Sequence, residues 1–379
     1  MERFDLLEGY TSFEEIEEKE NAEFELESAP FSAVKTKTEK DDDEDIKLDF
    51  IIIKTEHEGF NCDAESSSFK LCGKSLLEWV INATENPTII SDTELGVVNT
   101  VKPVLKDGEY TVVLYSDTPL ITKNLIKEVV GFTRDKGLNV CKLTRGYVFK
   151  TEYIKRVDEI YSPQVYYFDE EDLIIVSNFK QLSLVCETMR NRIISFHMSN
   201  GVQINDPSTT YIDSDVTIGK NVIIDKNVKI SGTCEICESV IIGCDTYICD
   251  ARIGEGTKII GAFIESSVIG ENNNISYGVK IVGGTIIDDK VVIDASSILN
   301  HCNIHCNCNI GYLCNLKNTE MAEAIMGNNV VCSSTKAINK VRIMKGACVK
   351  DSALIVAPYV VDEDVTICEG EFCKKSVQG

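Results

Sequence analysis

The second half of the chain has an aliphatic residue at every sixth position. The period runs without a slip from Ile212 to Ile248 and returns, after short slips, in later runs that end at Ile367. Neither the 3.6-residue period of an α-helix nor the two-residue alternation of a strand explains this spacing, whereas six-residue repeats with three short strands per turn do. The pattern therefore predicts a parallel β-helix, in which stacked turns share one aliphatic core.

The same repeat offers an explanation for several cysteines. A small inward side chain is expected two residues before each aliphatic residue, as at Val216 and Val222, and four cysteines occupy this position: Cys234, Cys302, Cys308 and Cys314. Free cysteine behaves as a small buried hydrophobe, so we expect these four side chains to pack in the core of the β-helix. The alternative is a zinc site at Cys234-x2-Cys237 or in the His/Cys cluster of residues 301–314. His301 and His305 are expected on the coil surface without a partner, and residues 318–342 are expected to be irregular.

Residues 49–178 alternate between strand and helix patterns. Strands are expected at 48–53 and 111–115, and helices at 76–81 and 122–134. Such alternation is typical of an open α/β sheet, which binds ligands at the carboxyl ends of its strands. Asp117 follows the second strand, where a carboxylate could hold a magnesium ion. The alternative is a simple turn and helix cap.

The net charge of the chain bears on which partners it can bind. The 379 residues carry a net charge of −23, and no basic stripe interrupts it, so nucleic acids and anionic membranes are not expected as partners. No apolar run is long enough to span a bilayer. We therefore expect a cytoplasmic protein whose 16 cysteines are reduced.

About half of the excess negative charge lies in residues 1–45, which hold 17 acidic and five basic residues. With little apolar periodicity, this segment is predicted to be a disordered acidic arm. An interaction arm for a basic partner and a solvated extension are both open, and the second is favoured.

Several motifs together indicate a family. Tyr-Ser-Asp-Thr-Pro-Leu at 115–120, the segments 71–80, 146–149 and 356–358, and the junction 176–207 are similar to the bifunctional UDP-N-acetylglucosamine pyrophosphorylase/glucosamine-1-phosphate N-acetyltransferase family. The resemblance implies a shortened, Rossmann-like nucleotidyltransferase domain followed by a left-handed parallel β-helix of hexapeptide repeats. It also implies Mg²⁺, a nucleotide-sugar or sugar-phosphate ligand, a homotrimer, and a place in making cell-wall precursors.

The resemblance also divides the chain and marks candidate residues. The expected parts are the arm 1–45, the nucleotidyltransferase-like domain 46–182, a linker helix 183–205, the β-helix 206–372 and a tail 373–379. The implied metal ligands are Asp117 and Asn178. The implied nucleotide- or sugar-binding residues are Gly73, Gly96, Thr144, Gly146 and Lys317.

Departures from the family concern the catalytic groups. The family's glycine-rich phosphate loop aligns with residues 53–61, where Glu56 and Glu58 replace glycines and Phe60 replaces a cation. Carboxylates would repel the phosphates that such a loop cradles. In the acetyltransferase half, Leu299 replaces the family's sugar-phosphate arginine. The coil that carries the general base is missing from 318–342, so we expect no use of acetyl-CoA.

Three hypotheses follow. The first is a catalytically degenerate relative that binds a sugar nucleotide or phosphosugar, or acts structurally. The second is an active sugar-1-phosphate nucleotidyltransferase with an altered substrate, which retention of Asp117 keeps open. The third is a scaffold in which the acidic arm recruits a partner. The altered loop and the missing base favour the first hypothesis.

Overall fold

The computed structural model describes residues 46–60, 65, 68–93, 95–160, 163–166, 173–333, 341–356 and 359–373. These residues form two compact units, and the division falls between Arg192 and Ile193. It lies within one helix, α6 (Phe179–Ser199). We call the two parts the α/β unit and the β-helix unit. The predicted acidic arm 1–45 lies outside the described residues.

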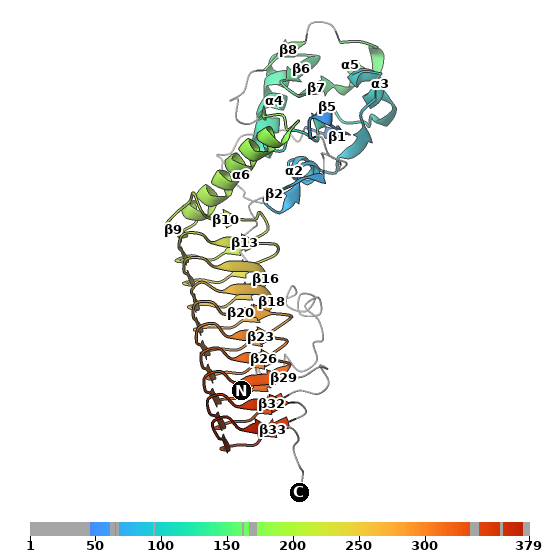
Figure 1. Ribbon diagram of the computed structural model, residues 1–379. Coiled ribbons are helices and arrows are strands. Elements are labelled where there is room, and N and C mark those ends of the chain that lie inside the picture. The colour runs from blue at the N-terminus through green and yellow to red at the C-terminus, as the bar shows by residue number, and fades with distance from the viewer. Residues whose placement is uncertain are drawn as a thin grey trace. The chain divides into compact units, whose positions relative to one another are not determined.

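The α/β unit is built on a mixed sheet of six described strands, in the order β4-β1-β5-β7-β6-β8 (Figure 1). The neighbours β4, β1 and β5 are parallel, and β7 is antiparallel to β5 and β6. The strands are β1 (Leu48–Lys54), β4 (Thr88–Ser91), β5 (Tyr110–Tyr115), β6 (Val140–Leu143), β7 (Gly146–Lys150) and β8 (Gln164–Val165), with a hairpin of β2 (Lys70–Leu71) and β3 (Lys74–Ser75). The helices are α2 (Leu76–Asn82), α3 (Val97–Val101), α4 (Lys123–Asp135) and α5 (Thr151–Arg156), with 3-10 turns η3 (Glu58–Phe60) and η5 (Lys102–Val104).

The apolar run of β1 is explained by burial on both faces of the sheet. Phe50 and Ile52 belong to one hydrophobic cluster, and Ile51 and Ile53 belong to another. A strand covered on both faces reads as a continuous apolar run rather than an alternating one. Helix α2 starts at a capping box of Ser75 and Glu78, which satisfies backbone N–H groups at the helix start.

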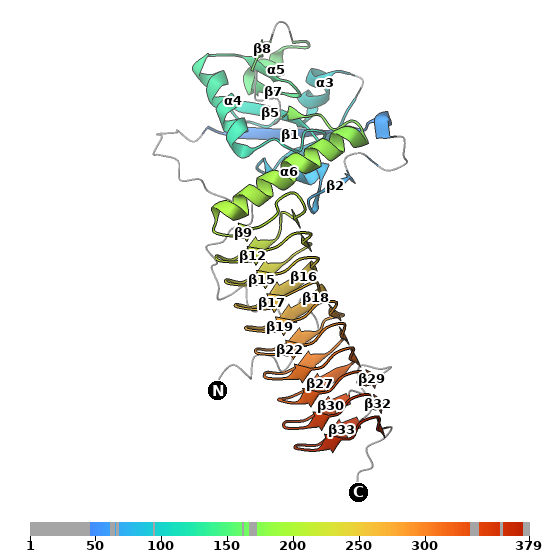
Figure 2. The same ribbon diagram turned by 60° about the vertical axis from the view of Figure 1, so that its left-hand side comes forward.

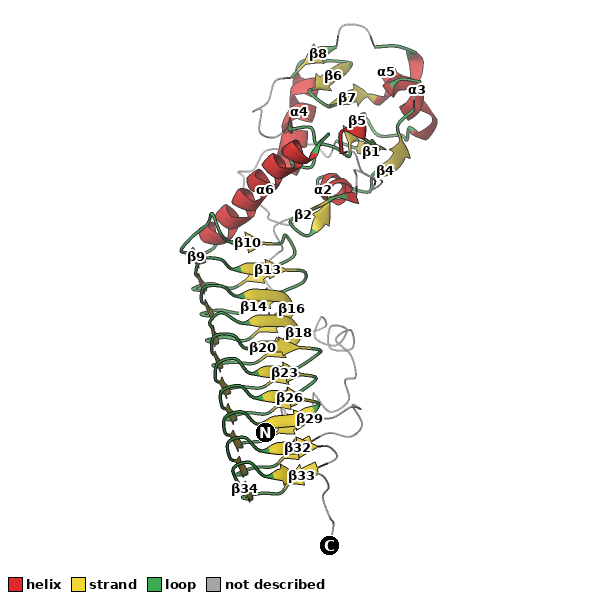
Figure 3. Cartoon of the chain, viewed as in Figure 1, coloured by secondary structure: helices red, strands yellow, loops and turns green. Residues whose placement is uncertain are grey.

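The β-helix unit stacks short parallel strands in three ladders (Figures 2 and 3). The first ladder contains β10 (Tyr211–Ile212), β13 (Lys229–Ser231), β16 (Tyr247–Ile253), β18 (Phe263–Ile269), β20 (Lys280–Val282), β23 (Ile298–Asn300), β26 (Asn315–Lys317), β29 (Val331–Ser333), β32 (Leu354–Val356) and β35 (Phe372–Cys373). The second contains β11 (Thr217–Ile218), β14 (Glu235–Ile236), the ends of β16 and β18, β21 (Ile286–Ile287), β24 (Asn303–Ile304), β27 (Thr319–Met321), β30 (Val341–Ile343) and β33 (Tyr359–Val361). The third contains β9 (Gln203–Ile204), β12 (Ile223–Ile224), β15 (Ile241–Ile242), β17 (Lys258–Ile259), β19 (Asn274–Ile275), β22 (Val292–Ile293), β25 (Asn309–Ile310), β28 (Ile325–Met326), β31 (Cys348–Val349) and β34 (Thr366–Ile367).

The periodic aliphatic residues form the core of this unit, as the repeat predicts. Ile224 pairs in register with Ile242, and Ile230 with Ile248, and all four are buried. Burying such a side chain contributes about 1.5–3 kcal/mol. The corners need left-handed backbone, and Asn221, one example, has a φ of 59°. The predicted fold class is confirmed.

The repeat continues where the sequence predicts irregular structure. Strands β27, β28 and β29 extend the ladders through residues 319–333, so the expectation of a break over 318–342 is wrong for these residues. Met321, Met326 and Cys332 are buried there in place of isoleucine. A pattern search restricted to Ile, Leu and Val misses them, although methionine fills an apolar core equally well. Residues 334–340 lie outside the described part of the chain.

Candidate functional site in the α/β unit

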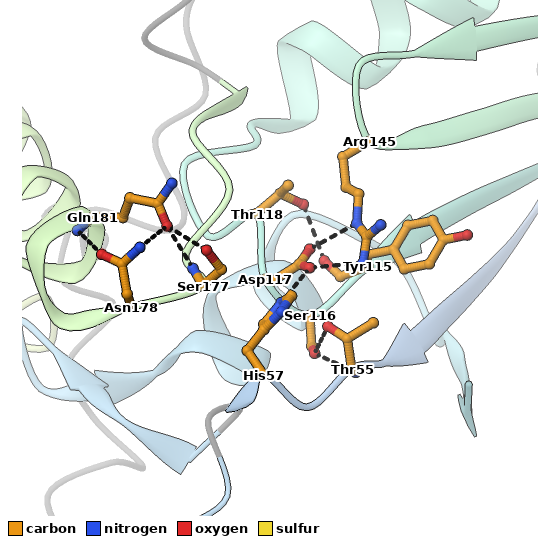
Figure 4. Close-up of polar contacts among 10 residues, drawn as sticks. All are labelled: Thr55, His57, Tyr115, Ser116, Asp117, Thr118, Arg145, Ser177, Asn178 and Gln181. Atoms are coloured by element: carbon orange, nitrogen blue, oxygen red, sulfur yellow. Dashed lines mark hydrogen bonds and ion pairs between the residues drawn. The ribbon is translucent and has the colours of Figure 1, made fainter. Parts of the chain in front are cut away.

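Asp117 lies at the carboxyl end of β5, beside the end of the parallel strand β1. The two strand ends are joined because the backbone N–H of Thr55 donates to Ser116 Oγ at 3.0 Å. The hydroxyl of Thr118 donates to the carbonyl of Tyr115 at 3.0 Å and closes the turn. Figure 4 shows these side chains around Asp117. This edge is where open α/β sheets hold their ligands.

Two side chains donate hydrogen bonds to the carboxylate of Asp117: the cation Arg145 and the imidazole of His57. Arg145 donates from Nη2 to Oδ2 at 2.9 Å and from Nε to Oδ1 at 3.4 Å. His57 donates from Nε2 to Oδ2 at 2.9 Å (Figure 4). The side chain of Asp117 is only 2% exposed, against 30% for Arg145 and 21% for His57. Both carboxylate oxygens therefore already have charged hydrogen-bond donors.

Local structure holds Arg145 in this position. Thr144 and Arg145 form the two-residue turn between β6 and β7, and the guanidinium carbon lies 4.1 Å from the ring centroid of Tyr115. Burial raises the pKa of Tyr115 to about 12, so its ring stays neutral beneath the cation. Gly146 has a φ of 135°, and a Cβ there would lie 2.7 Å from the carbonyl oxygen of Val113. Only glycine permits this close approach of the turn to β5.

Of the two carboxylates that the sequence places in the loop after β1, Glu56 lines a depression there, and the side chain of Glu58 lies outside the described part of the structure. A depression of about 510 Å³ is bounded by Lys54, Thr55, Glu56, His57, Glu65, Ser91, Asp92 and Arg145. Lys54 forms an ion pair with Glu65 at 2.5 Å and lies 4.0 Å from Glu56. The glycine that remains in this loop, Gly59, is held against the backbone of Ser177, where a Cβ would collide. The absence of a side chain at Gly59 thus allows the loop to pack against the backbone of Ser177.

Asn178 caps helix α6. Its Oδ1 accepts from the backbone N–H of Gln181 at 3.0 Å, and its Nδ2 donates to Gln181 Oε1 at 3.1 Å (Figure 4). Ser177 donates to the same Gln181 oxygen from its N–H and its hydroxyl. The bond to Asn178 Oδ1 satisfies one of the orphan N–H groups at the start of the helix, that of Gln181.

A magnesium ion does not fit the residues expected to bind it. Mg²⁺ requires oxygen ligands at about 2.0–2.1 Å in near-octahedral geometry. The oxygens of Asp117 are held by Arg145 and His57, and Asn178 is engaged at the helix start. Within the described residues, no group of three or more His, Cys, Asp or Glu side chains is placed to hold a metal ion. The metal-binding roles of Asp117 and Asn178 stay predictions, and these contacts argue against them.

The other candidate residues are dispersed. Gly73 has a φ of 91° in the turn of the β2–β3 hairpin, and Gly96 precedes α3 with open space around it. Thr144 is exposed beside Arg145. Lys317 lies in β26 of the other unit. The structure therefore brings Arg145, His57 and Asp117 together, and the sequence analysis named only the last as a site residue.

The cysteines of the repeat lie in the core. Cys302, Cys308 and Cys314 are fully buried, and Cys234 is 2% exposed, as the packing interpretation predicts. Burial raises the pKa of Cys308 to about 11 and that of Cys234 to about 12. Such thiols are protonated and unreactive at neutral pH.

His305 has a partner, contrary to expectation. Its Nδ1 lies 3.0 Å from Asp288 Oδ2, and its Nε2 lies 3.9 Å from Glu320 Oε1. The hydrogen bond to Asp288 raises the pKa of His305. Asp288 lies 17 residues earlier, on the preceding turn of the β-helix. The sequence shows that the two residues are neighbours only when successive turns are aligned. His301 contacts its neighbour Asn300 at 2.5 Å.

Comparison with known proteins gives one consistent result. No family model matches the chain. Over 105 residues the chain is 42% identical to the "Bifunctional protein GlmU" of Clostridioides difficile (strain 630), covering 28% of this chain and 23% of that protein. The GlmU of Lactobacillus helveticus (strain DPC 4571) is 26% identical, over 54% of this chain and 65% of the relative. The chain is similar to the bifunctional GlmU proteins.

This finding confirms the resemblance that the motifs indicate. The GlmU of Thermoanaerobacter pseudethanolicus (strain ATCC 33223 / 39E) gives the same result, at 27% identity over 55% of this chain and 65% of the relative. The chain thus spans between 23% and 65% of the length of these three relatives.

The solved structures to which the chain is similar include two acyltransferases. The UDP-N-acetylglucosamine O-acyltransferase (LpxA) from Moraxella catarrhalis RH4 is 20% identical, with a TM-score of 0.17, over 43% of this chain and 66% of that chain. The UDP-N-acetylglucosamine acyltransferase from Campylobacter jejuni is 18% identical, with a TM-score of 0.22, over 43% and 68%. No described helix is both long and apolar enough to cross a membrane.

Proposed function

We propose that this protein is a catalytically degenerate relative of the UDP-N-acetylglucosamine-forming GlmU proteins, and that it binds a sugar phosphate or nucleotide sugar without transferring a nucleotidyl group. One observation carries the proposal: the carboxylate of Asp117 is buried and paired with both Arg145 and His57. Nucleotidyl transfer depends on a carboxylate-bound metal ion that neutralises the phosphates. A carboxylate that already accepts hydrogen bonds from an arginine and a histidine is poorly suited to that role.

The electrostatics of the loop support the same proposal. Glu56, Glu65 and Asp92 line the depression, and the lysine there, Lys54, is engaged with Glu65. A triphosphate placed against this loop would meet carboxylates instead of a cradle of backbone N–H groups. Transfer of a nucleotidyl group relies on positioning and stabilising those phosphates, so the loss of rate is expected to be large.

The β-helix unit supports the loss of acetyl transfer. An acetyltransferase needs a general base for the sugar amine, and positioned bases typically contribute about 10²–10⁴-fold in rate. Residues 318–342 contain no histidine. His305, on a neighbouring coil, has its ring nitrogens turned to Asp288 and Glu320. We therefore propose that acetyl-CoA is not a substrate.

We also propose that three copies associate through the β-helix, as the resemblance implies. One outward column of the first ladder is largely apolar and partly exposed, and it is interrupted by Lys229, Lys280 and Asn315. We call its apolar members the apolar column: Tyr211, Tyr247, Phe263, Ile298, Val331, Leu354 and Phe372. Nine strand spacings make this ladder about 43 Å long, which suits burial against another chain. Analytical ultracentrifugation of the full chain should give a trimer, and a monomer at micromolar concentration would contradict this part of the proposal.

One observation favours the alternative of an active nucleotidyltransferase with an altered substrate. Asp117 remains at the carboxyl end of β5, inside a nearly intact family motif. If a ligand displaced Arg145 and His57, the carboxylate would become available to a metal ion. The division into an α/β domain, a linker helix and a β-helix also remains part of the proposal, but helix α6 spans Phe179–Ser199 instead of 183–205, and β9 (Gln203–Ile204) already belongs to the ladder that was expected to start at 206.

The test is an assay for pyrophosphate release from UTP and N-acetylglucosamine-1-phosphate with Mg²⁺, with a GlmU enzyme as the positive control. We expect no release above background. Turnover in the ordinary range of about 1–10³ per second would contradict the proposal and favour the alternative. A parallel assay for free CoA, with acetyl-CoA and glucosamine-1-phosphate, should also be silent.

A further inference from the structure

Arg145 turns one edge of its guanidinium to Asp117 and leaves the other edge open. Nε and Nη2 donate to the carboxylate (Figure 4). Within the described part of the chain, no hydrogen bond or ion pair engages Nη1. Arg145 also lines the depression beside the loop after β1. The outer edge therefore offers N–H donors in the fork geometry that binds carboxylate and phosphate groups.

The guanidinium is held before any ligand arrives. Its face stacks on Tyr115 at 4.1 Å, its inner edge is fixed by a buried carboxylate, and its backbone belongs to a two-residue turn. Restraint of this kind lowers the entropy lost when a side chain binds a ligand. His57 is bound to the same carboxylate and lines the same depression.

The surrounding charges limit what this edge can bind. Lys54 is committed to Glu65, while Glu56 and Asp92 contribute negative charge to the depression. One free guanidinium edge matches one oxyanion group. A triphosphate would place further negative charges near the two carboxylates, which costs more than the single fork returns. The exposed hydroxyl of Ser91 at the same depression suits a polar ligand.

We propose that the outer edge of Arg145 binds a single carboxylate or phosphate group of a small polar ligand, and that this binding requires no divalent metal ion. The inference rests on the proposed function, and it adds the chemical class of the ligand and the residue that recognises it. Arg145 supplies the positive charge that a metal ion would otherwise supply at Asp117, and His57 adds a hydrogen-bond donor. Asp117 is then a positioning residue for Arg145.

The test is calorimetric titration of the full chain with inorganic phosphate, N-acetylglucosamine-1-phosphate, N-acetylglucosamine and UTP, each in EDTA and in Mg²⁺. We expect N-acetylglucosamine-1-phosphate to bind equally in both buffers, and at least tenfold more tightly than N-acetylglucosamine. UTP should bind no more tightly than the sugar phosphate. Arg145→Lys keeps the charge but loses the fork, so the Kd should rise at least tenfold. Arg156→Met removes an exposed arginine that pairs with Glu152, and this control should leave the Kd unchanged.

A readout on the unmodified chain guards against a folding defect in the variant. The NMR signal of the Arg145 Nε–H should shift on addition of inorganic phosphate in EDTA. Binding that requires Mg²⁺, a Kd that Arg145→Lys leaves unchanged, or no binding of any oxyanion at about 10 mM would each overturn the inference. Nucleotidyl transfer would instead contradict the proposed function, whatever the titrations show.

Discussion

Replacing Asp117 by asparagine should destabilise the α/β unit. Metal-binding carboxylates are often costly to fold, so removing an unpaired one tends to leave stability unchanged or to raise it. Here the carboxylate is 2% exposed and contacts Arg145 and His57, so its loss leaves the Arg145 cation without its counter-charge and the His57 ring without its acceptor. Breaking a fully buried ion pair costs about 3–5 kcal/mol. Because Arg145 is 30% exposed and can regain water, we expect about 2–3 kcal/mol.

The chain provides its own probe for this measurement. Trp79 is the single tryptophan of the chain and lies 6% exposed in α2 of the α/β unit. Its fluorescence therefore follows unfolding of that unit rather than of the β-helix. With a urea dependence of about 2 kcal/mol per M, Asp117→Asn should lower the midpoint by about 1–1.5 M.

A matched control separates this effect from the general loss of a charge. Asp107 pairs with Lys155 at 3.2 Å, but its side chain is 91% exposed. Asp107→Asn should therefore change the free energy of unfolding by less than about 1 kcal/mol. An Asp117→Asn protein as stable as the parent, or more stable, would refute the reasoning, because it would mean that the pairs with Arg145 and His57 contribute nothing.

Three further results are expected. Burial lowers the pKa of His197 from 6.5 to about 4, so the neutral ring is compatible with the fold above pH 6.5. As the pH falls from 6.5 to about 4, about 3 kcal/mol of the free energy of unfolding should be lost. Calorimetry of wild type and His197→Leu over this pH range checks the prediction, and an equal pH dependence in both proteins would contradict it. Ile248 is buried, so Ile248→Ala should destabilise the β-helix by about 2–5 kcal/mol in circular dichroism melts. Ile241 is partly exposed, and Ile241→Ala should cost less than about 1 kcal/mol. Equal effects of the two substitutions would contradict the stacked core. Cys368 is exposed and should react with a thiol reagent in the native protein, whereas Cys308, whose pKa burial raises to about 11, should react only on unfolding; rapid labelling of Cys308 would be inconsistent with its place in the core.

The sequence predicts the β-helix because its physical cause is periodic. Each turn adds an equivalent inward side chain, so the spacing of residues such as Ile224 and Ile242 predicts the core before the fold is known. The prediction was wrong over 319–333 because Met321 and Cys332 fill the same space with other side chains. The rule for the core was right, and the set of residues allowed to satisfy it was too narrow.

The candidate site was only partly predictable. Asp117 follows from the pattern of a strand and a turn, but its partner Arg145 lies 28 residues further along the chain. It reaches Asp117 through the antiparallel pairing of β5 and β7, which no local signal specifies. His57 stands in the altered loop, and the direction of its side chain cannot be read from the sequence.

The cap of α6 carried a usable signal. Asn178 followed by Gln181 is the spacing of a helix-capping pair, which already favours a structural role for the asparagine. Likewise, the contact between His305 and Asp288 could have been found by aligning neighbouring turns of the repeat, since equivalent positions lie about 17 or 18 residues apart. The capping role of Asn178 and the contact of His305 could therefore both have been predicted from the sequence.

The proposed function depends on the carboxylate of Asp117 being engaged by Arg145 and His57. A manganese titration followed by electron paramagnetic resonance, with the wild type beside Asp117→Asn and with UTP present, tests this most directly. We expect the two proteins to bind Mn²⁺ alike, because Asp117 contributes nothing to metal binding. Tighter Mn²⁺ binding by the wild type, lost in Asp117→Asn, would show that the metal displaces Arg145 and His57, and would contradict the account.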